Sequence, residues 1–141
     1  MSIRAVSLGL ILGLMAALFL GNIRARAHDE GQWSTTDQVI SQWYKHLMQP
    51  DNPTASCCGE ADAYWCDILR NERIDGKVKT FCIITDDRPD EPFKRPHIDV
   101  GTEIEVPDHK LKWDRGNPTG HAIVFVSRMG YVFCYVQGTG I

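Results

Sequence analysis

Two adjacent cysteines, Cys57 and Cys58, are the residues whose type and spacing most restrict the chemistry of this chain. They cannot easily bond to each other, because a disulfide between neighbours closes a strained ring. Each must pair with a distant cysteine, remain a thiol or bind a ligand. The odd number of cysteines leaves at least one thiol unpaired within a monomer; the five are Cys57, Cys58, Cys66, Cys82 and Cys134.

Cys58 and His121 could act together as a nucleophile and a base. We predict a single helical turn over residues 59–63, and a thiol at the start of such a turn has a lowered pKa. His121 opens an apolar strand that a glycine turn and another strand follow. This order and setting resembles the NlpC/P60 cell-wall peptidases over about twenty residues, which implies a cysteine hydrolase. The chain has Ser56-Cys57-Cys58-Gly59 where that family has Asp-Cys-Ser-Gly, and no long helix follows.

Metal ligands are sparse and widely spaced. His97 and Asp99 share one face of an extended segment, and His and carboxylate groups suit zinc or copper. Removal of residues 1–27 would expose His28, whose amine and imidazole can chelate copper, but a second partner histidine has no obvious place. We predict no metal site and no cofactor, with these residues as weak candidates.

The segment 107–119 shows no clear periodicity, and loops of this length in compact domains are often functional. A tryptophan among cations could stack on a sugar or hold an anionic group. The alternative is that Trp113 and Leu111 simply pack this loop onto the core. The predicted ligand-binding residues are His109, Lys112, Trp113, Arg115 and Asn117.

Apolar spacing defines the elements that would position these residues. A helix is predicted from Thr35 or Thr36 to about Gln49, with apolar positions at helical spacing before Pro50. Strands are predicted over residues 64–70, 77–85, 97–100, 102–106, 121–127 and 131–136. The fold class is therefore α+β: one N-terminal amphipathic helix packed on a small antiparallel β-barrel or sandwich of about five to six strands.

The strand registers predict the disulfides. A five-residue loop over 72–76 would set Cys66 opposite Cys82 and bury one face of that hairpin, which carries Tyr64, Cys66, Ile68, Val78, Cys82 and Ile84. A two-residue Met129-Gly130 loop would set Phe125 opposite Cys134. Cys134 then bonds Cys57 or Cys58, and we favour Cys57. The remaining thiol is either inert and buried or reactive.

The first 27 residues are typical of a secretory signal peptide: Arg4, an apolar run and a small-x-small site at Ala25-Arg26-Ala27. The mature part, 28–141, is then a single disulfide-stapled domain in a periplasmic or secreted location. Losing three arginines moves the net charge of −3 to −6. An acidic domain disfavours nonspecific nucleic-acid binding, and no integral membrane segment remains.

Two stretches carry a second resemblance: Ser-Cys-Cys-Gly-Glu-Ala-Asp-Ala-Tyr-Trp from Ser56, and His-Lys-Leu-Lys-Trp-Asp-Arg-Gly-Asn-Pro-Thr-Gly-His from His109. With the signal peptide, they resemble a group of small exported bacterial proteins of unknown function. That resemblance implies export but no activity. We expect an exported binding module or envelope accessory; the alternative is the hydrolase built on Cys58 and His121.

Overall fold

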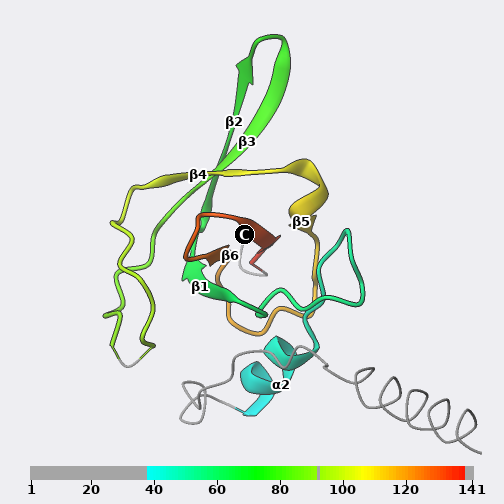
Figure 1. Cartoon of the computed structure of the whole chain (residues 1–141), viewed down its shortest axis with the longest axis vertical. Coiled ribbons are helices and arrows are strands. Elements are labelled where there is room, and N and C mark those ends of the chain that lie inside the picture. The colour runs from blue at the N-terminus through cyan, green and yellow to red at the C-terminus, as the bar shows by residue number, and fades with distance from the viewer. Residues whose placement is uncertain (1–37, 92, 139–141) are drawn as a thin grey trace, which may run out of the picture.

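A computed structural model describes residues 38–91 and 93–138 as one α-helix and two β-sheets (Figure 1). The central sheet has the strand order β1-β6-β7-β5, and the second sheet has the order β2-β3-β4. The elements are α2 (Gln38–His46), β1 (Ala61–Trp65), β2 (Ile68–Ile74), β3 (Lys77–Ile83), β4 (Glu103–Val106), the 3₁₀ turn η2 (Asp108–Lys110), β5 (Leu111–Lys112), β6 (Ile123–Ser127) and β7 (Val132–Val136).

The central sheet confirms the predicted C-terminal hairpin. Phe125 lies opposite Cys134 as predicted, but a bulge follows Phe125 and the turn has three residues, 128–130, instead of two, since the Ser127 N–H donates to the Tyr131 carbonyl. Gly130 has a φ of 82°, which favours glycine at this turn. β1 pairs with β6 in antiparallel orientation, and β5 adds to β7 as a parallel strand. The prediction of a purely antiparallel sheet is therefore wrong at this one edge.

The β2–β3 hairpin has a different register from the predicted one. Its turn is the dipeptide Asp75-Gly76, with φ values of 51° and 77°, and Ile74 lies opposite Lys77. Two positive φ angles are the signature of the tight turn that matches strand twist, and Asp-Gly suits it. Leu69, rather than Cys66, faces Cys82. The predicted five-residue loop over 72–76 is wrong. Asp75 and Gly76 alone reverse the chain, and residues 72–74 extend strand β2.

The predicted strand over residues 64–70 is broken at Cys66-Asp67, and its two halves join different sheets. Ile68 and Val78, predicted to be buried, are 51% and 54% exposed as a result. Residues 59–63 do not form the predicted helical turn, because Ala61 already begins β1. Residues 97–100, predicted as a strand, are irregular.

Two core clusters lie on opposite faces of the central sheet. The cluster between the sheets includes Val124, Val126 and Tyr135, together with Ile84 and Val106. The cluster on the other face joins the sheet to α2 and the segment after it; it comprises Tyr44, Leu47, Cys57, Ala63, Ile123, Phe125, Cys134 and Val136. Alternate residues of β6 thus serve alternate clusters, as the two-residue period of a strand requires.

Helix α2 contributes one aromatic anchor to the second cluster. The Tyr44 ring meets the Phe125 ring edge-on, with centroids 5.9 Å apart. Val39, predicted to face the core, is 64% exposed. The predicted helix start at Thr35 or Thr36 and the signal peptide lie outside the described residues. None of the described helices is long and apolar enough to cross a membrane.

Each core cluster contains one disulfide, and both have the predicted partners. Cys57 bonds Cys134, and Cys66 bonds Cys82 with Cα atoms 5.7 Å apart. Cys66 reaches Cys82 from the corner between β1 and β2, so the pairing is right although the register behind it is wrong. Cys58 is the free thiol. Two bridges are compatible with an oxidising, exported location.

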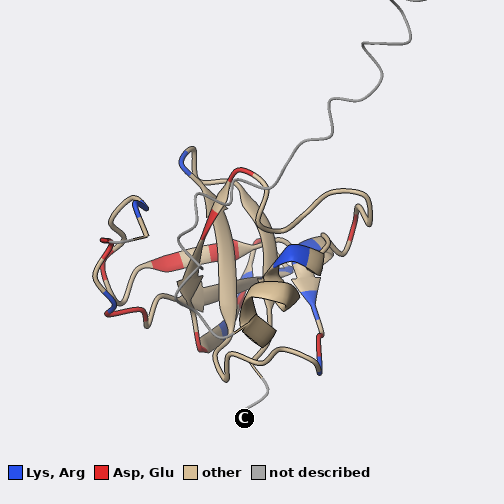
Figure 2. Ribbon diagram, turned by 90° about the horizontal axis from the view of Figure 1, so that it is seen from below, with Lys and Arg blue, Asp and Glu red and all other residues tan. Residues whose placement is uncertain are grey.

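The architecture is therefore two stacked sheets and a covering helix, with no closed barrel in the described part of the chain. The strands outnumber the five to six predicted, because the first predicted strand splits and β5 arises within segment 107–119. Acidic and basic residues are both spread over strands and loops (Figure 2).

We predict that Cys134→Ser strongly destabilises the domain. The Cys57–Cys134 bridge closes a loop of 77 residues, which by chain entropy contributes about 4 kcal/mol. The melting temperature should fall by more than about 10 °C. Thiol titration of the denatured protein should rise from one thiol to two.

Cys58→Ser is the matched control, since a hydroxyl can replace the thiol as donor to the carbonyl of Tyr44. This variant should melt like the parent and titrate no thiol. Parent-like melting of Cys134→Ser with no additional thiol would show that Cys134 is not bridged.

Candidate binding groove and the ion pair beside it

An open groove of about 800 Å³ lies where β1 begins and the β6–β7 hairpin turns. Three segments distant in sequence form it: residues 59–62, the pair Phe93-Lys94, and the hairpin turn with the start of β7. Its lining residues are Gly59, Glu60, Ala61, Asp62, Phe93, Lys94, Ser127, Arg128, Met129, Tyr131 and Phe133. A volume of this order matches sites for small molecules and short peptides.

The groove combines apolar side chains with charges of both signs. Met129 and Tyr131 are 81% and 65% exposed, which leaves a large apolar surface open to solvent. Phe93 and Phe133 add two more aromatic rings to the lining. The charged members are two acids and two bases: Glu60, Asp62, Lys94 and Arg128. Such a lining suits a ligand that carries an apolar group together with both a positive and a negative group.

Arg95 holds the Phe93-Lys94 side of the groove against β1. Its guanidinium is buried and donates to the carbonyl of Ala63 at 2.9 Å and to Asp86 Oδ2 at 2.6 Å. It also donates to Asp90 Oδ1 at 3.1 Å and to the carbonyl of Arg88 at 3.1 Å. Four acceptors fix one side chain, so the residues just before it have a defined position.

Lys94 shows how closely this segment is constrained. Its φ of 52° lies in the left-handed region, which is uncommon for a residue with a side chain. Such a conformation persists when the surrounding structure determines it. The buried Arg95 that follows supplies such a constraint, because four acceptors hold its side chain.

Asp86 completes a buried ion pair with Arg95. Its carboxylate accepts hydrogen bonds from the Trp65 backbone N–H at 3.1 Å and from Arg88 Nη2 at 2.6 Å. Burial alone would raise the pKa of Asp86, but the hydrogen bonds from Arg88 and Arg95 outweigh it and hold that pKa well below its usual value. Asp86 is therefore ionised at neutral pH and bonded to two guanidinium groups.

This ion pair also covers the outer edge of β1. The Trp65 N–H and the Ala63 carbonyl point away from β6, and Asp86 and Arg95 satisfy them. The Trp65 carbonyl accepts from the Thr85 N–H at 3.0 Å. An uncovered edge strand would offer its backbone to another chain, so these side chains protect β1 and fix the groove loop together.

A stack of three side chains extends the cluster to His121. The Arg88 Cζ lies 4.0 Å from the centroid of the Trp65 ring. The centroid of the His121 ring lies 3.8 Å from that of Trp65, and the two ring planes are inclined by 10°. Two planar groups this close must occupy opposite faces of the indole. His121 Nδ1 is 2.9 Å from Asp67 Oδ2, and Asp67 also accepts from the Ala122 N–H at 2.7 Å. His121 thus packs the corner where β1 passes into β2.

Cys58 has the surroundings of an inert thiol. Its sulfur donates to the Tyr44 carbonyl at 3.4 Å, and burial raises the pKa of Cys58 to about 12. The helical turn expected to lower that pKa is absent. Cys58 contacts Tyr44 and Ser56, whereas His121 contacts Trp65 and Asp67. Cys58 is half-buried, and this geometry favours an inert thiol over the nucleophile–base pair.

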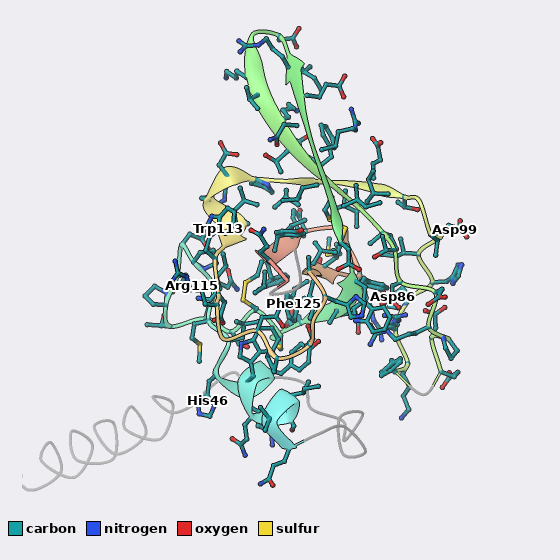
Figure 3. All side chains as sticks on the ribbon, turned by 180° about the vertical axis from the view of Figure 1, so that it is seen from behind. His46, Asp86, Asp99, Trp113, Arg115 and Phe125 are labelled. Atoms are coloured by element: carbon teal, nitrogen blue, oxygen red, sulfur yellow. A yellow bond between two sulfur atoms is a disulfide. The ribbon has the colours of Figure 1, made fainter. Side chains whose placement is uncertain are left out.

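The predicted ligand-binding segment contains the turn η2 and strand β5, and its candidate residues divide into two groups. Asn117 is buried and donates to the carbonyls of His121 and Gln137, both at 2.9 Å, so it fastens the loop. Trp113 is 79% exposed, which rules out its predicted alternative role in the core. His109, Arg115 and, in part, Lys112 are also exposed. Trp113 and Arg115 lie on the side of the molecule away from Asp86 and Asp99 (Figure 3).

The weak metal candidates form an acid–histidine cluster. His97 Nδ1 lies 2.7 Å from Asp90 and Nε2 lies 3.0 Å from Asp99. Hydrogen bonds that the protonated His97 ring donates to Asp90 and Asp99 raise the pKa of His97. These two hydrogen bonds occupy both ring nitrogens of His97, and within residues 38–91 and 93–138 no three His, Cys, Asp or Glu side chains are arranged so that they could hold a metal ion. His28 lies outside the described residues.

None of the residues lining the groove is predicted as a site residue from the sequence. One available signal was the apolar pair Met129 and Tyr131 flanking the predicted Gly130 turn, where polar residues are usual. Another was Phe93, a lone aromatic residue within a charged, proline-rich segment. Comparison of the chain with family models, curated proteins and solved structures gives no match.

We predict that Asp86→Asn lowers the free energy of unfolding by about 3–5 kcal/mol at neutral pH, because it removes the buried carboxylate closest to Arg95 and leaves only the more exposed Asp90 as its counter-charge. Chemical denaturation measures the change. The matched control is Asp87→Asn, which removes the same charge from the neighbouring exposed position and should be nearly neutral. Equal effects of the two variants would exclude a special role for the buried pair.

The same pair predicts the response to acid. Since the pKa of Asp86 is lower in the folded state, its contribution is fully present above the unfolded-state value of about 3.9 and declines as the pH falls below it. The parent should therefore lose stability below about pH 4. Asp86→Asn should show a shallower decline, and an unchanged slope would contradict the assignment.

Proposed function

We propose that this chain is an exported, disulfide-stapled binding module of the bacterial envelope whose groove takes a short peptide. The observation that carries the proposal is the groove beside β1, where aromatic side chains adjoin two acids and two bases. A peptide with free termini carries an amine, a carboxylate and apolar side chains within a few ångströms of one another. It therefore offers each group that the lining can recognise.

Export rests on the N-terminal sequence and on the cysteines. The first 27 residues have the pattern of a cleaved signal, and two stretches of the remaining chain, from Ser56 and from His109, resemble small exported bacterial proteins. Disulfides persist in oxidising compartments, and the structure contains two. A periplasmic or secreted accessory protein agrees with both observations.

The lining suggests an orientation for the ligand. Lys94 and Arg128 would attract the carboxylate, while Glu60 and Asp62 would attract the amine. The exposed ring of Tyr131 offers a face for stacking an apolar side chain. Because the Arg95–Asp86 pair fixes the loop, this part of the groove exists before the ligand binds, which reduces the entropy cost of binding.

The Trp113 surface, which consists of Trp113 and the exposed Arg115 two residues later, is a second candidate, because a tryptophan that is 79% exposed could stack on a sugar ring. It follows β5, at the opposite edge of the central sheet from β1. The hydrolase alternative needs Cys58 as a thiolate, and burial opposes that state. Binding therefore accounts for more of the geometry than catalysis does.

The test uses tripeptides as probes, with binding followed by saturation-transfer NMR and calorimetry. Gly-Phe-Gly with free termini should bind more tightly than Gly-Gly-Gly, and acetylated, amidated Gly-Phe-Gly should bind more weakly. Tyr131→Ala and Arg128→Ala should each weaken binding about fivefold or more, since each removes one recognised contact.

Trp113→Ala is the matched control, because it removes an equally exposed aromatic ring at the far edge of the sheet. It should leave tripeptide binding unchanged. Loss of binding in Trp113→Ala, with binding retained in Tyr131→Ala, would assign the site to the Trp113 surface instead. Absence of tripeptide binding by the parent would reject the peptide ligand.

A further inference from the structure

The β2–β3 hairpin extends away from the two core clusters (Figure 1). Strand β2 forms one edge of the second sheet, with β3 as its partner. Three large apolar side chains on this hairpin are exposed: Ile68 at 51%, Leu69 at 39% and Val78 at 54%. The hairpin therefore presents an edge with apolar surface on both of its faces.

The turn determines which backbone groups lie on that edge. Ile74 and Lys77 flank a two-residue turn, so they form a hydrogen-bonded pair, and alternate residues back along β2 also bond to β3. The N–H and C=O groups of Leu69, Asn71 and Arg73 then point outward. In the described chain no backbone or side-chain hydrogen bond from outside the sheet reaches these groups.

This open edge contrasts with β1, where Asp86 and Arg95 cover the exposed backbone. Natural sheets normally protect long edges with such devices. β2 is a longer strand than β1, with seven residues against five, and it carries no comparable cover. Because the chain covers the edge of β1 but leaves that of β2 open, the open edge points to another strand as the partner of β2.

The β2 sequence, Ile-Leu-Arg-Asn-Glu-Arg-Ile, is complementary to itself in antiparallel orientation. Pairing two copies about Asn71 sets Arg70 opposite Glu72 and Ile68 opposite Ile74. Leu69 and Arg73 then form the outward hydrogen-bonded pairs, in agreement with the backbone directions. Shifting the register by two residues in either direction sets Arg70 against Arg70 or Glu72 against Glu72, which is unfavourable.

We infer that two copies of this chain form a symmetric dimer by antiparallel pairing of their β2 strands about Asn71. The two three-stranded sheets become one six-stranded sheet. Within each copy Arg70 already pairs with Glu72 and with Glu103, both at 2.6 Å. The contact is isologous, so it adds the cross-strand Arg70–Glu72 pair twice and joins these ion pairs into one network. The cross-strand pairs occupy non-hydrogen-bonded positions, where opposing side chains come closest. The self-complementary charges favour a second copy over an unrelated extended peptide.

Charge reversal provides the test, with sedimentation velocity of the mature exported protein over a wide concentration range as the readout. The parent should form a concentration-dependent dimer. Glu72→Arg and Arg70→Glu should each weaken the dimer about tenfold or more, since each replaces two attractive pairs with two repulsive ones. Circular dichroism should confirm that both variants remain folded.

Mixing the two single variants is the decisive arm. One variant then carries two acids and the other two bases at the paired positions, so the mixture should form a heterodimer although neither variant dimerises alone. Repeating the series in a Cys58→Ser background excludes an intermolecular disulfide. A parent that stays monomeric, a Glu72→Arg variant that dimerises like the parent, or a mixture without heterodimer would each overturn the inference.

Discussion

The buried pair of Asp86 and Arg95 is the interaction on which the arrangement of β1 and the groove depends. Asp86 binds the Trp65 N–H and Arg95 binds the Ala63 carbonyl, so the pair takes the place of a neighbouring strand along β1. Through Arg88 the pair reaches the indole of Trp65, and through that ring the stack reaches His121. Because Arg95 follows Phe93 and Lys94 directly, the same ion pair also fixes the position of these two groove-lining residues. A buried pair of charges gives little net stability, but it fixes geometry at this edge.

The two disulfides act at a different level, since each fastens one layer to the central sheet. Cys57–Cys134 holds the segment after α2 against β7, and Cys66–Cys82 holds the corner between the sheets against β3. A four-stranded sheet with both faces covered needs two separate cores in a short chain, and each core here is small. One bridge in each core compensates for that limited burial. The free Cys58 lies beside the first bridge, and its high pKa keeps it as a thiol at neutral pH.

Sequence reasoning predicted the features that depend on local patterns. The glycine turn and alternating apolar residues predicted the C-terminal hairpin. The cysteine partners were also predicted, although the register that set Cys66 opposite Cys82 is wrong. The break at Cys66-Asp67 was missed because the alternation of Tyr64, Cys66 and Ile68 continues through the corner. That corner depends on distant partners, such as the Ala122 carbonyl that accepts from the Cys66 N–H. The groove was not predicted for a similar reason, since its three segments are distant in sequence and Arg95 holds one of them through Asp86. In addition, the charged, proline-rich segment around Phe93 has the composition of a solvated loop.

The Trp65 amide reports most directly on the claim that the Asp86–Arg95 pair holds the edge of β1 and the groove loop. This N–H points away from β6 and donates to Asp86 at 3.1 Å, so its protection from hydrogen exchange depends on that pair. Exchange measured by NMR in the parent and in Arg95→Ala compares the two states. The account predicts slow exchange at Trp65 in the parent and fast exchange in the variant, while amides between β6 and β7 stay protected. Fast exchange at Trp65 in the parent, or equal protection in both proteins, would contradict it.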